Sequence, residues 1–228
     1  MSHIALSFLK LNSLLKVSVS RDMKNNHCIF TLKITTALIR LLEFNLVLIV
    51  ILLKISAMKA KKASETLSIT TKVVLPNDTN TLGNLFGGEL LAWMDVISSV
   101  AAHRHCKRVV VTAAVNNVSF KRAIKHASIV TLEAKVTRAF KSSMEIIVDV
   151  FDEDPVTGER VKANEGIYTF VAVDQNGGPI EVPELIPESE QEIKRYEGAL
   201  RRKQLSLILA GKMKPEEATE LKKLFQND

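Results

Sequence analysis

From Thr66 onward, apolar and polar residues follow regular patterns that predict secondary structure. Apolar side chains alternate from Leu67 to Leu75, which predicts a strand that stops at Pro76. Residues 77–84 are polar and rich in Asn, Asp and Gly, so a loop follows. A helix is then predicted from about Phe86 to His105 by an apolar stripe with helical spacing. The stripe consists of Phe86, Leu90, Trp93, Met94, Ile97, Val100 and Ala101.

The opposite side of this helix carries a single acid among small residues. Asp95 shares that side with Gly88, Leu91, Ala92, Ser99 and Ala102. Small residues allow another backbone to approach closely. We therefore expect the helix to be buried on both sides, against its own sheet and against a second surface.

Four strand-like runs follow the helix, at residues 108–120, 128–137, 143–151 and 160–173. The last two flank the turn cluster of residues 152–159, which is typical of a hairpin. One long helix that must be covered by antiparallel strands indicates an α+β domain, residues 65–176, in which a curved sheet of about five strands wraps the helix. Residues 177–228 form a proline-rich exit and a helical tail. Its first helix spans 188–210, is capped by Gly211, and carries residues 201–203 on a solvated face; a second starts at Pro215.

Residues 1–57 have a different composition from the rest of the chain. Their apolar core, Leu46 to Leu53, is shorter than the roughly 20 residues that span a bilayer, although a marginal span over residues 35–53 can be drawn. The position is wrong for a signal peptide, and Met58 resembles a natural start. We expect an extension outside the fold; a membrane or targeting segment and a helical appendage remain alternatives.

The charge balance excludes one class of partner. Residues 1–57 contribute about five of the six formal positive charges, so the remainder of the chain is nearly neutral and nucleic-acid binding is not indicated. The two cysteines, Cys28 and Cys106, are far apart, which argues against a disulfide framework and favours a reducing, cytoplasmic compartment.

The start of the long helix is a candidate binding site for a polar ligand group. A helix N-terminus presents unpaired N–H groups and a partial positive charge. Gly87 and Gly88 lack side chains and would let such a group reach the backbone, although close packing explains paired glycines equally well. There is neither a GxGxxG nor a P-loop pattern, so nucleotide binding has little support.

Asp95 is the sharpest candidate for chemistry. A carboxylate among apolar neighbours needs a partner or a function, because burying an unpaired charge is costly. It is either a structural acid paired with Lys or Arg, or a general base or nucleophile aimed at an electrophile near the helix start. Asn80 could orient water or a carbonyl group, or hold an Asx turn. Asn84 is better explained as a helix N-cap than as a catalyst.

Other polar residues have weaker claims. His103, His105 and Cys106 have spacings that point their side chains apart on a helix, so no metal site is expected. A G-x-S-x-G nucleophile elbow is absent. Lys141, Ser142 and Ser143 lie between two predicted strands and could hold phosphates.

Four segments of the sequence resemble a known family. "LPNDTNTLGNLFGGELLAWMD", "VAAHRHC", "VVVTAAVNNVSF" and "AFKSSMEIIVDVFDEDP" occur in order and resemble the acyl-CoA thioesterases of the hotdog fold, of the cytosolic long-chain hydrolase type and its bacterial single-domain relatives. The resemblance covers about residues 67–197. It implies hydrolysis of fatty acyl-CoA to free fatty acid and coenzyme A, without a further cofactor.

The resemblance also implies the roles of the candidate residues. Asp95 matches the acid on the central helix, which serves as base or, as a second route, as nucleophile, and Asn80 matches a loop asparagine supplied by the opposing subunit. The backbone N–H groups at Gly87 and Gly88, beside Asn84, would polarise the thioester carbonyl. The phosphates of coenzyme A would lie near Lys141, Ser142 and Ser143.

The resemblance also implies a homodimer, because each site takes residues from two subunits. A hexamer built as a trimer of dimers is suggested by the family alone. No membrane contact is expected unless the span over residues 35–53 is real. Two other functions stay open at this stage. The first is a non-catalytic acyl-CoA binding or sensing module, and the second is a hydratase or dehydratase, which would normally need a His near the helix start.

Overall fold

The computed structural model describes residues 41–49 and 59–225, and the chain divides into two compact units, residues 1–54 and 55–228. In the first unit, residues 41–49 form a helix. The rest of the predicted N-terminal extension lies outside the described residues, so that prediction stays untested. Within the part of the chain that the structure describes, no helix is both long and apolar enough to cross a membrane.

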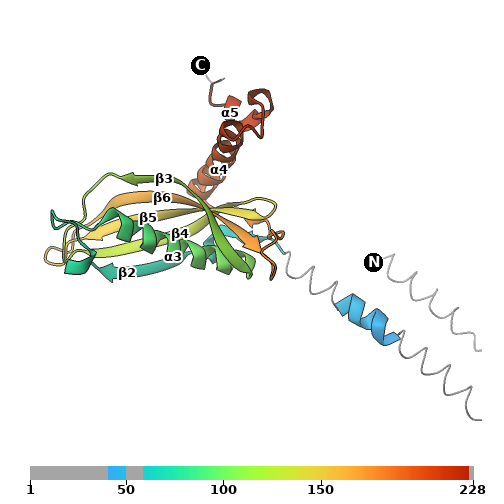
Figure 1. The fold of residues 1–228 in the computed structure, drawn as a ribbon, viewed down its shortest axis with the longest axis horizontal. Coiled ribbons are helices and arrows are strands. Elements are labelled where there is room, and N and C mark those ends of the chain that lie inside the picture. The colour runs from blue at the N-terminus through green and yellow to red at the C-terminus, as the bar shows by residue number, and fades with distance from the viewer. Residues whose placement is uncertain (1–40, 50–58, 226–228) are drawn as a thin grey trace, which may run out of the picture. The chain divides into compact units, whose positions relative to one another are not determined.

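A five-stranded antiparallel sheet forms the body of the second unit (Figure 1). Its strands lie in the order β2-β4-β5-β6-β3, so β2 and β3 are the two edges. The bounds are β2 Ser68–Val73, β3 Val109–Phe120, β4 Ile129–Ala139, β5 Ser143–Glu153 and β6 Arg160–Val173. A separate parallel pair, β1 Lys61–Lys62 with β7 Leu185–Ile186, joins the segment before the sheet to the segment after it.

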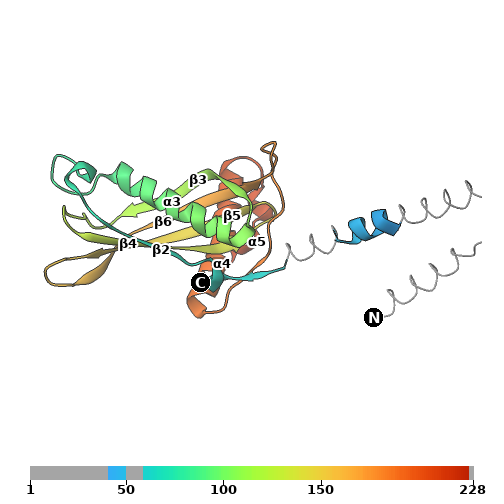
Figure 2. The ribbon, with the colours of Figure 1, turned by 90° about the horizontal axis from the view of Figure 1, so that it is seen from below.

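One long helix, α3 (Gly87–Cys106), lies along one face of the sheet (Figure 2). Leu90, Met94 and Ala101 are buried against core-facing residues of β4, β5 and β6, such as Leu132, Ile146 and Phe170. The predicted architecture, one helix wrapped by about five antiparallel strands, is therefore confirmed. Two members of the predicted stripe, Phe86 and Val100, are exposed instead. Phe86 precedes the helix with extended backbone angles, so helical spacing does not apply to it.

The first strand buries its polar side rather than its apolar side. Ser68 is completely buried, whereas Ile69 and Val73 are more than half exposed. The burial is tolerated because Thr66 and Ser68 satisfy their hydroxyl groups locally: Thr66 Oγ1 donates to Ala63 O at 2.7 Å, and Ser68 Oγ donates to Thr66 O at 3.1 Å. Alternation thus located the strand without revealing which of its sides faces the core.

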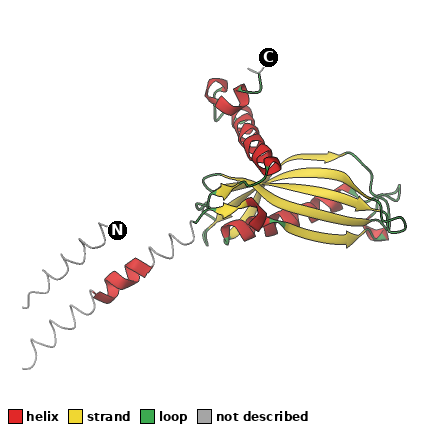
Figure 3. Ribbon diagram, turned by 180° about the vertical axis from the view of Figure 1, so that it is seen from behind, coloured by secondary structure: helices red, strands yellow, loops and turns green. Residues whose placement is uncertain are grey.

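The tail forms α4 (Glu190–Leu209) and, after the 3₁₀ turn η3 (Pro215–Glu217), the short helix α5 (Thr219–Lys222). Ser189 caps α4 by accepting a hydrogen bond from the Glu192 N–H group, and Gly211 follows the helix with a positive φ of 67°. Seen from behind, α4 rises from the side of the sheet opposite α3 (Figure 3). Both faces of the sheet therefore carry a helix.

Candidate active site

The loop between β2 and α3 is held by its own hydrogen bonds. The Leu75 N–H group donates to Asp78 Oδ2 at 2.8 Å, and the Phe86 N–H group donates to Asp78 O at 2.8 Å. Between them, the Asn80 N–H group donates to Asn84 O at 2.7 Å. These bonds fix the path by which the chain enters α3, and they place Asn80 at an exposed position.

Asn80 uses one end of its side chain to hold this loop. Its Oδ1 atom accepts hydrogen bonds from the backbone N–H groups of Leu82, at 2.9 Å, and Asn84, at 3.2 Å. This is the local turn anticipated as one alternative for Asn80. Among the hydrogen bonds of the described residues, its amide nitrogen donates none, so this nitrogen is free to donate to a ligand.

The N-terminus of α3 has no side-chain cap. The N-cap residue is Phe86, so the prediction that Asn84 caps the helix was wrong. Asn84 lies two residues before the N-cap and forms an isolated antiparallel bridge with Lys125. Among the described residues, no side-chain oxygen accepts a hydrogen bond from the first N–H groups of the helix, at Gly87 and Gly88. A Cβ atom on Gly88 would lie 2.5 Å from the Phe86 ring, so only glycine fits there unless the ring moves.

Asp95 is half-buried on the open side of α3 and accepts a hydrogen bond from a neighbouring strand. Thr112 Oγ1, on the edge strand β3, donates to Asp95 Oδ1 at 2.8 Å. Within the described residues no Lys or Arg forms an ion pair with this carboxylate, so the structural alternative has no partner in one copy. Burial, with a smaller contribution from the Asp95 charge, raises the pKa of the nearby Tyr168 to about 12. Tyr168 is therefore a neutral phenol, which donates to Leu91 O at 3.1 Å.

Thr112 is a candidate functional residue that the sequence patterns missed. It lies in a β-branched run that predicts only a strand. The pairing of β3 with β6 shifts register between Thr112 and Ala114, so β3 bulges at this point and regular alternation does not predict where the hydroxyl group points. Only the contact between β3 and α3 in the folded structure identifies Thr112 as a candidate.

In one copy, the start of α3 and Asp95 face different directions. Asp95 lies on the side of α3, seven positions beyond Gly88, which at 1.5 Å per residue is about 10 Å along the axis. The first N–H groups of a helix point along its axis, away from the residues that follow. A single copy therefore holds the two parts of the candidate site without directing them at one place.

The predicted phosphate-binding residues, Lys141, Ser142 and Ser143, lie at the other end of the domain. The entry to α3 is tied to the loop that leads into β4, because the Leu85 N–H group donates to Ile124 O at 2.7 Å. Lys141 follows the end of β4 and accepts a hydrogen bond from the Val182 N–H group at 3.1 Å. The 11 residues of β4 cover about 35 Å. One copy does not bring these residues to Asn80, and their assignment stays a prediction.

His103, His105 and Cys106 serve to anchor the end of α3. His105 is completely buried, and its Nε2 atom lies 2.7 Å from Pro183 O. Burial lowers the pKa of His105 and raises that of the Cys106 thiol. His103 Nδ1 lies 3.0 Å from Arg108 O. In residues 41–49 and 59–225, no three His, Cys, Asp or Glu side chains are grouped so as to hold a metal ion.

One surface of the domain is suited to meet a second copy. The edge strand β3 exposes Val109, Val111 and Val115, and its outer backbone groups have no neighbouring strand in the described residues. The adjacent side of α3 exposes Ala92 and Val96. An edge strand beside an apolar helix face is a typical site for strand pairing.

Comparison with known proteins identifies the family. Residues 82–159 match the model of the Thioesterase superfamily. The chain is 44% identical over 134 residues, 59% of its own length and 78% of the other, to YkhA of Bacillus subtilis, described as an uncharacterized acyl-CoA thioester hydrolase. It is 38% identical over 128 residues to the cytosolic acyl coenzyme A thioester hydrolase of Rattus norvegicus, covering 55% of this chain but only 33% of that enzyme.

Solved structures agree with this result. An acyl-CoA hydrolase from Staphylococcus aureus, in complex with butyryl coenzyme A and coenzyme A, superposes with a TM-score of 0.63 at 34% identity, covering 66% of this chain and 92% of that one. An apo-hexameric acyl-CoA thioesterase has a TM-score of 0.65 at 38% identity, with coverages of 67% and 97%.

Structures of the same Staphylococcus aureus enzyme also exist with alanine in place of an asparagine, an aspartate or a threonine. Those positions are separated by fifteen and then seventeen residues, as are Asn80, Asp95 and Thr112. Fold, sequence and coverage agree, and the chain therefore belongs to the thioesterase superfamily, among its acyl-CoA thioester hydrolases.

Proposed function

We propose that this protein hydrolyses fatty acyl-CoA to a free fatty acid and coenzyme A, with Asp95 as the residue that activates water. The observation that carries the proposal is the Asp95 carboxylate, which has no cationic partner among the described residues and is oriented by Thr112 through a 2.8 Å hydrogen bond. An oriented, unpaired carboxylate and an uncapped helix N-terminus are the two parts that acyl transfer to water needs. The matching spacing of Asn80, Asp95 and Thr112 in a relative supports the assignment.

In the proposed mechanism, one carboxylate oxygen of Asp95 accepts a proton from water while the water oxygen attacks the thioester carbonyl carbon. The carbonyl oxygen becomes an oxyanion that accepts hydrogen bonds from the first N–H groups of α3, at Gly87 and Gly88. The carbon–sulfur bond then breaks, coenzyme A leaves as a thiolate that takes up the proton, and the fatty acid is released. No separate cofactor takes part, because coenzyme A is itself part of the substrate. Direct attack by Asp95 to form an anhydride is the second route.

The site is proposed to form between two copies of the chain. The geometry of α3 supports this, because its first N–H groups point along the helix axis, away from Asp95, which lies about 10 Å further along the same helix. If two α3 helices pack antiparallel about a midpoint between Leu91 and Ala92, Asp95 lies level with the partner's Gly88. The exposed β3 edges would pair alongside, and the amide of Asn80 would come from the partner's loop.

In the same antiparallel arrangement, the turn between β4 and β5 of one copy lies at one end of the helix pair. The other copy carries its Asn80 loop at that same end. This supports the proposal that Lys141, Ser142 and Ser143 contact phosphates of coenzyme A bound at the site of the other copy. A trimer of such dimers is proposed as the assembly, supported by the hexameric relative. The proposed location is the cytoplasm, supported by the cytosolic rat relative.

The test is release of free coenzyme A thiol from acyl-CoAs of increasing chain length by the purified full-length protein and its Asp95→Ala and Asp95→Asn variants. We expect turnover by the unaltered protein and loss of about a thousandfold or more in both variants, with the oligomer intact. Tight binding of acyl-CoA without turnover by the unaltered protein would instead identify a sensing module. Unchanged turnover in both variants would remove Asp95 from the mechanism.

A further inference from the structure

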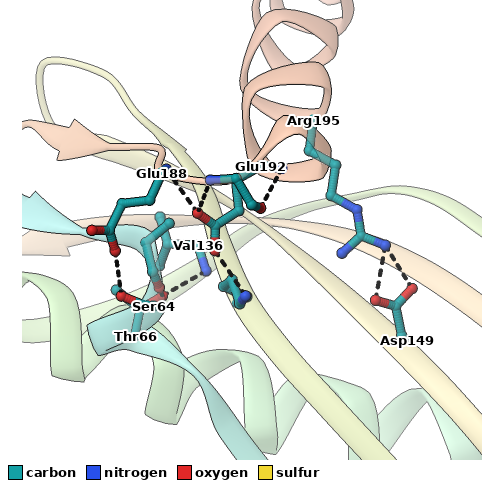
Figure 4. A network of polar contacts seen from close by, with 10 residues as sticks. Ser64, Thr66, Val136, Asp149, Glu188, Glu192 and Arg195 are labelled. Atoms are coloured by element: carbon teal, nitrogen blue, oxygen red, sulfur yellow. Dashed lines mark hydrogen bonds and ion pairs between the residues drawn. The ribbon is translucent and has the colours of Figure 1, made fainter.

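On the side of the sheet opposite α3, helix α4 is fastened by charged contacts (Figure 4). Arg195 donates to both oxygens of Asp149, on β5, at 2.9 and 2.8 Å. Glu192 accepts from Lys135 Nζ, on β4, at 2.9 Å. Ion pairs that are partly shielded from water fix the distance between α4 and the sheet, but they do not fill the space between them with apolar side chains.

A cleft of about 630 Å³ lies in that space, lined by one stripe of α4 and by β5 and β6. The stripe follows one face of the helix, because its successive turns are three or four residues apart. It consists of Lys194, Arg195, Gly198, Arg201, Arg202 and Leu205. Basic side chains normally occupy the solvent side of a surface helix, whereas here they line a cleft against the sheet. Gly198, at the middle of the stripe, has no side chain, and a Cβ atom there would lie 3.0 Å from the Arg202 guanidinium.

The lining of the cleft is apolar between these basic residues. Ile147 and Ile167 are cross-strand partners at the floor of the cleft, but only 4% and 5% of their surfaces are exposed, so they offer little free surface to a ligand. Leu205, Leu221 and Leu224 approach from α4 and the tail. The cleft therefore joins a hydrocarbon surface to a cationic rim, and its volume lies within the range of small-molecule sites.

The positive charge of this rim exceeds its negative charge. Arg195 is neutralised by Asp149, and Arg202 by Glu145. Lys162 is paired with both Asp149 and Glu165, the one carboxylate that lines the cleft. In the part of the chain that the structure describes, Lys194 and Arg201 form no ion pair. Two cations at the edge of an apolar cleft are suited to an anion that carries an alkyl chain.

We propose that this cleft binds a long-chain fatty acid anion at a site separate from the active site, with its carboxylate on Lys194 and Arg201 and its chain along Leu205, Leu221 and Leu224. The choice of a fatty acid rests on the proposed function, which releases that product. The sheet separates the cleft from α3, so occupancy of the cleft does not block acyl-CoA directly. The protein would thus hold its own product on its reverse face.

The first experiment measures lysine protection in the full-length protein. Amine-reactive labelling followed by mass spectrometry compares Lys194 with Lys212, an exposed lysine beyond the end of α4. Hexadecanoate, used below its micelle concentration, is expected to slow labelling of Lys194 at least fivefold and to leave Lys212 unchanged. Octanoate and coenzyme A, which lack the long chain, are expected to protect neither lysine. Equal labelling with and without hexadecanoate would overturn the proposal.

The second experiment uses equilibrium dialysis of hexadecanoate against matched variants. The double variant Lys194→Ala/Arg201→Ala is expected to weaken binding at this site about tenfold. The control, Lys212→Ala/Lys214→Ala, removes the same charge elsewhere and is expected to bind normally. Neither variant touches the proposed active site, so acyl-CoA turnover should persist in both.

The outcomes separate this proposal from the proposed function. Protection of Lys194 by hexadecanoate without any acyl-CoA turnover would support fatty acid binding in the cleft and reject the proposed hydrolase activity. Turnover without protection of Lys194 would support the hydrolase activity and reject fatty acid binding in the cleft. If Lys194 is not labelled in the ligand-free protein and becomes labelled only on dilution, a second copy of the chain covers the cleft. That result would overturn fatty acid binding.

Discussion

Asp95 is oriented by one hydroxyl group, and the direction of its carboxylate depends on that bond. Replacing Thr112 with Val keeps the β-branched shape that suits the strand but removes the donor to Asp95. A hydrogen bond to a charged group contributes about 1.5–3 kcal/mol, so we predict that kcat falls about ten- to a hundredfold. KM and the melting temperature should change little, because Val has nearly the same shape as Thr and the Thr112 hydroxyl group makes no other hydrogen bond within the described residues. Steady-state kinetics and thermal unfolding measure the two effects.

The matched control is Thr112→Ser, which keeps the hydroxyl group and should retain most of the activity. If Thr112→Val matched the unaltered protein in kcat, the hydrogen bond would have no catalytic importance. If both substitutions lowered the melting temperature equally, the role of Thr112 would be structural.

His105 makes stability depend on pH. Burial, the largest cause, lowers its pKa below the ordinary value of about 6.5, with a further contribution from the nearby Lys61. The folded protein therefore prefers the neutral ring, and this contribution to stability is complete above about pH 6.5 and lost as pH falls through the lowered folded pKa. We predict that the melting temperature falls more steeply below pH 6.5 in the unaltered protein than in His105→Gln. The Gln amide still can donate to Pro183 O. Parallel curves for the two proteins would contradict this.

At the residue scale, the sequence located Asp95, because an acid among apolar positions is conspicuous on a helical projection. It could not locate Thr112, whose hydroxyl group reaches Asp95 only through the β3 bulge. It placed the helix cap on Asn84, because a polar residue before a helix is a typical cap. Asn84 instead lies two residues before the N-cap, in a bridge with Lys125, and the helix starts uncapped after Phe86.

At the element scale, α4 is attached to the sheet mainly by paired charges, and the best buried of these pairs sets how firmly it is held. Glu145 has a side chain only 4% exposed, and Arg202 binds it through two nitrogens at 3.0 and 2.6 Å. We predict that Arg202→Ala lowers the free energy of unfolding by about 3 kcal/mol, because it leaves a buried carboxylate without its partner. Urea unfolding monitored by circular dichroism measures the loss.

The exposed pair between Lys141 and Glu181, with nitrogen and oxygen 4.0 Å apart, provides the comparison. Lys141→Ala should cost less than about 0.5 kcal/mol, since exposed ion pairs contribute little. A loss in Arg202→Ala no larger than that in Lys141→Ala would show that α4 is not held by this pair. The double variant Glu145→Gln/Arg202→Met should recover part of the loss, because no charge is then left buried.

Elements were predictable from the sequence where one periodicity dominates. The limits of α3 and the four later strands agree with their apolar patterns, because those segments are long enough for a periodicity to be detected. The two-residue strands β1 and β7 have no periodicity to detect. The basic run at Arg201–Lys203 was expected to face solvent, but Arg202 instead binds Glu145. Charge pairing across a sheet depends on strand register, which single-segment patterns do not contain.

At the scale of the whole molecule, the proposed active site needs two chains, and each chain would contribute a different part to it. Asp95 and Thr112 belong to one copy, whereas Asn80 and the start of α3 belong to the other. The sequence indicated the second surface through the small residues around Asp95, but it gave no distance. The first N–H groups of α3 point away from Asp95 of the same copy, so a second copy is needed to bring a helix start to that carboxylate.

Mixing two inactive variants tests this arrangement. Asp95→Ala and Asn80→Ala should each be inactive alone. After subunit exchange in an equal mixture, half of the dimers contain one chain of each variant. In such a mixed dimer, one of the two sites has both Asp95 and Asn80 intact. We predict recovery of roughly one quarter of the unaltered thiol-release rate. Mixing Asp95→Ala with the double variant Asp95→Ala/Asn80→Ala should recover nothing. If the first mixture also stayed inactive although mass spectrometry showed mixed dimers, both residues would act within one chain.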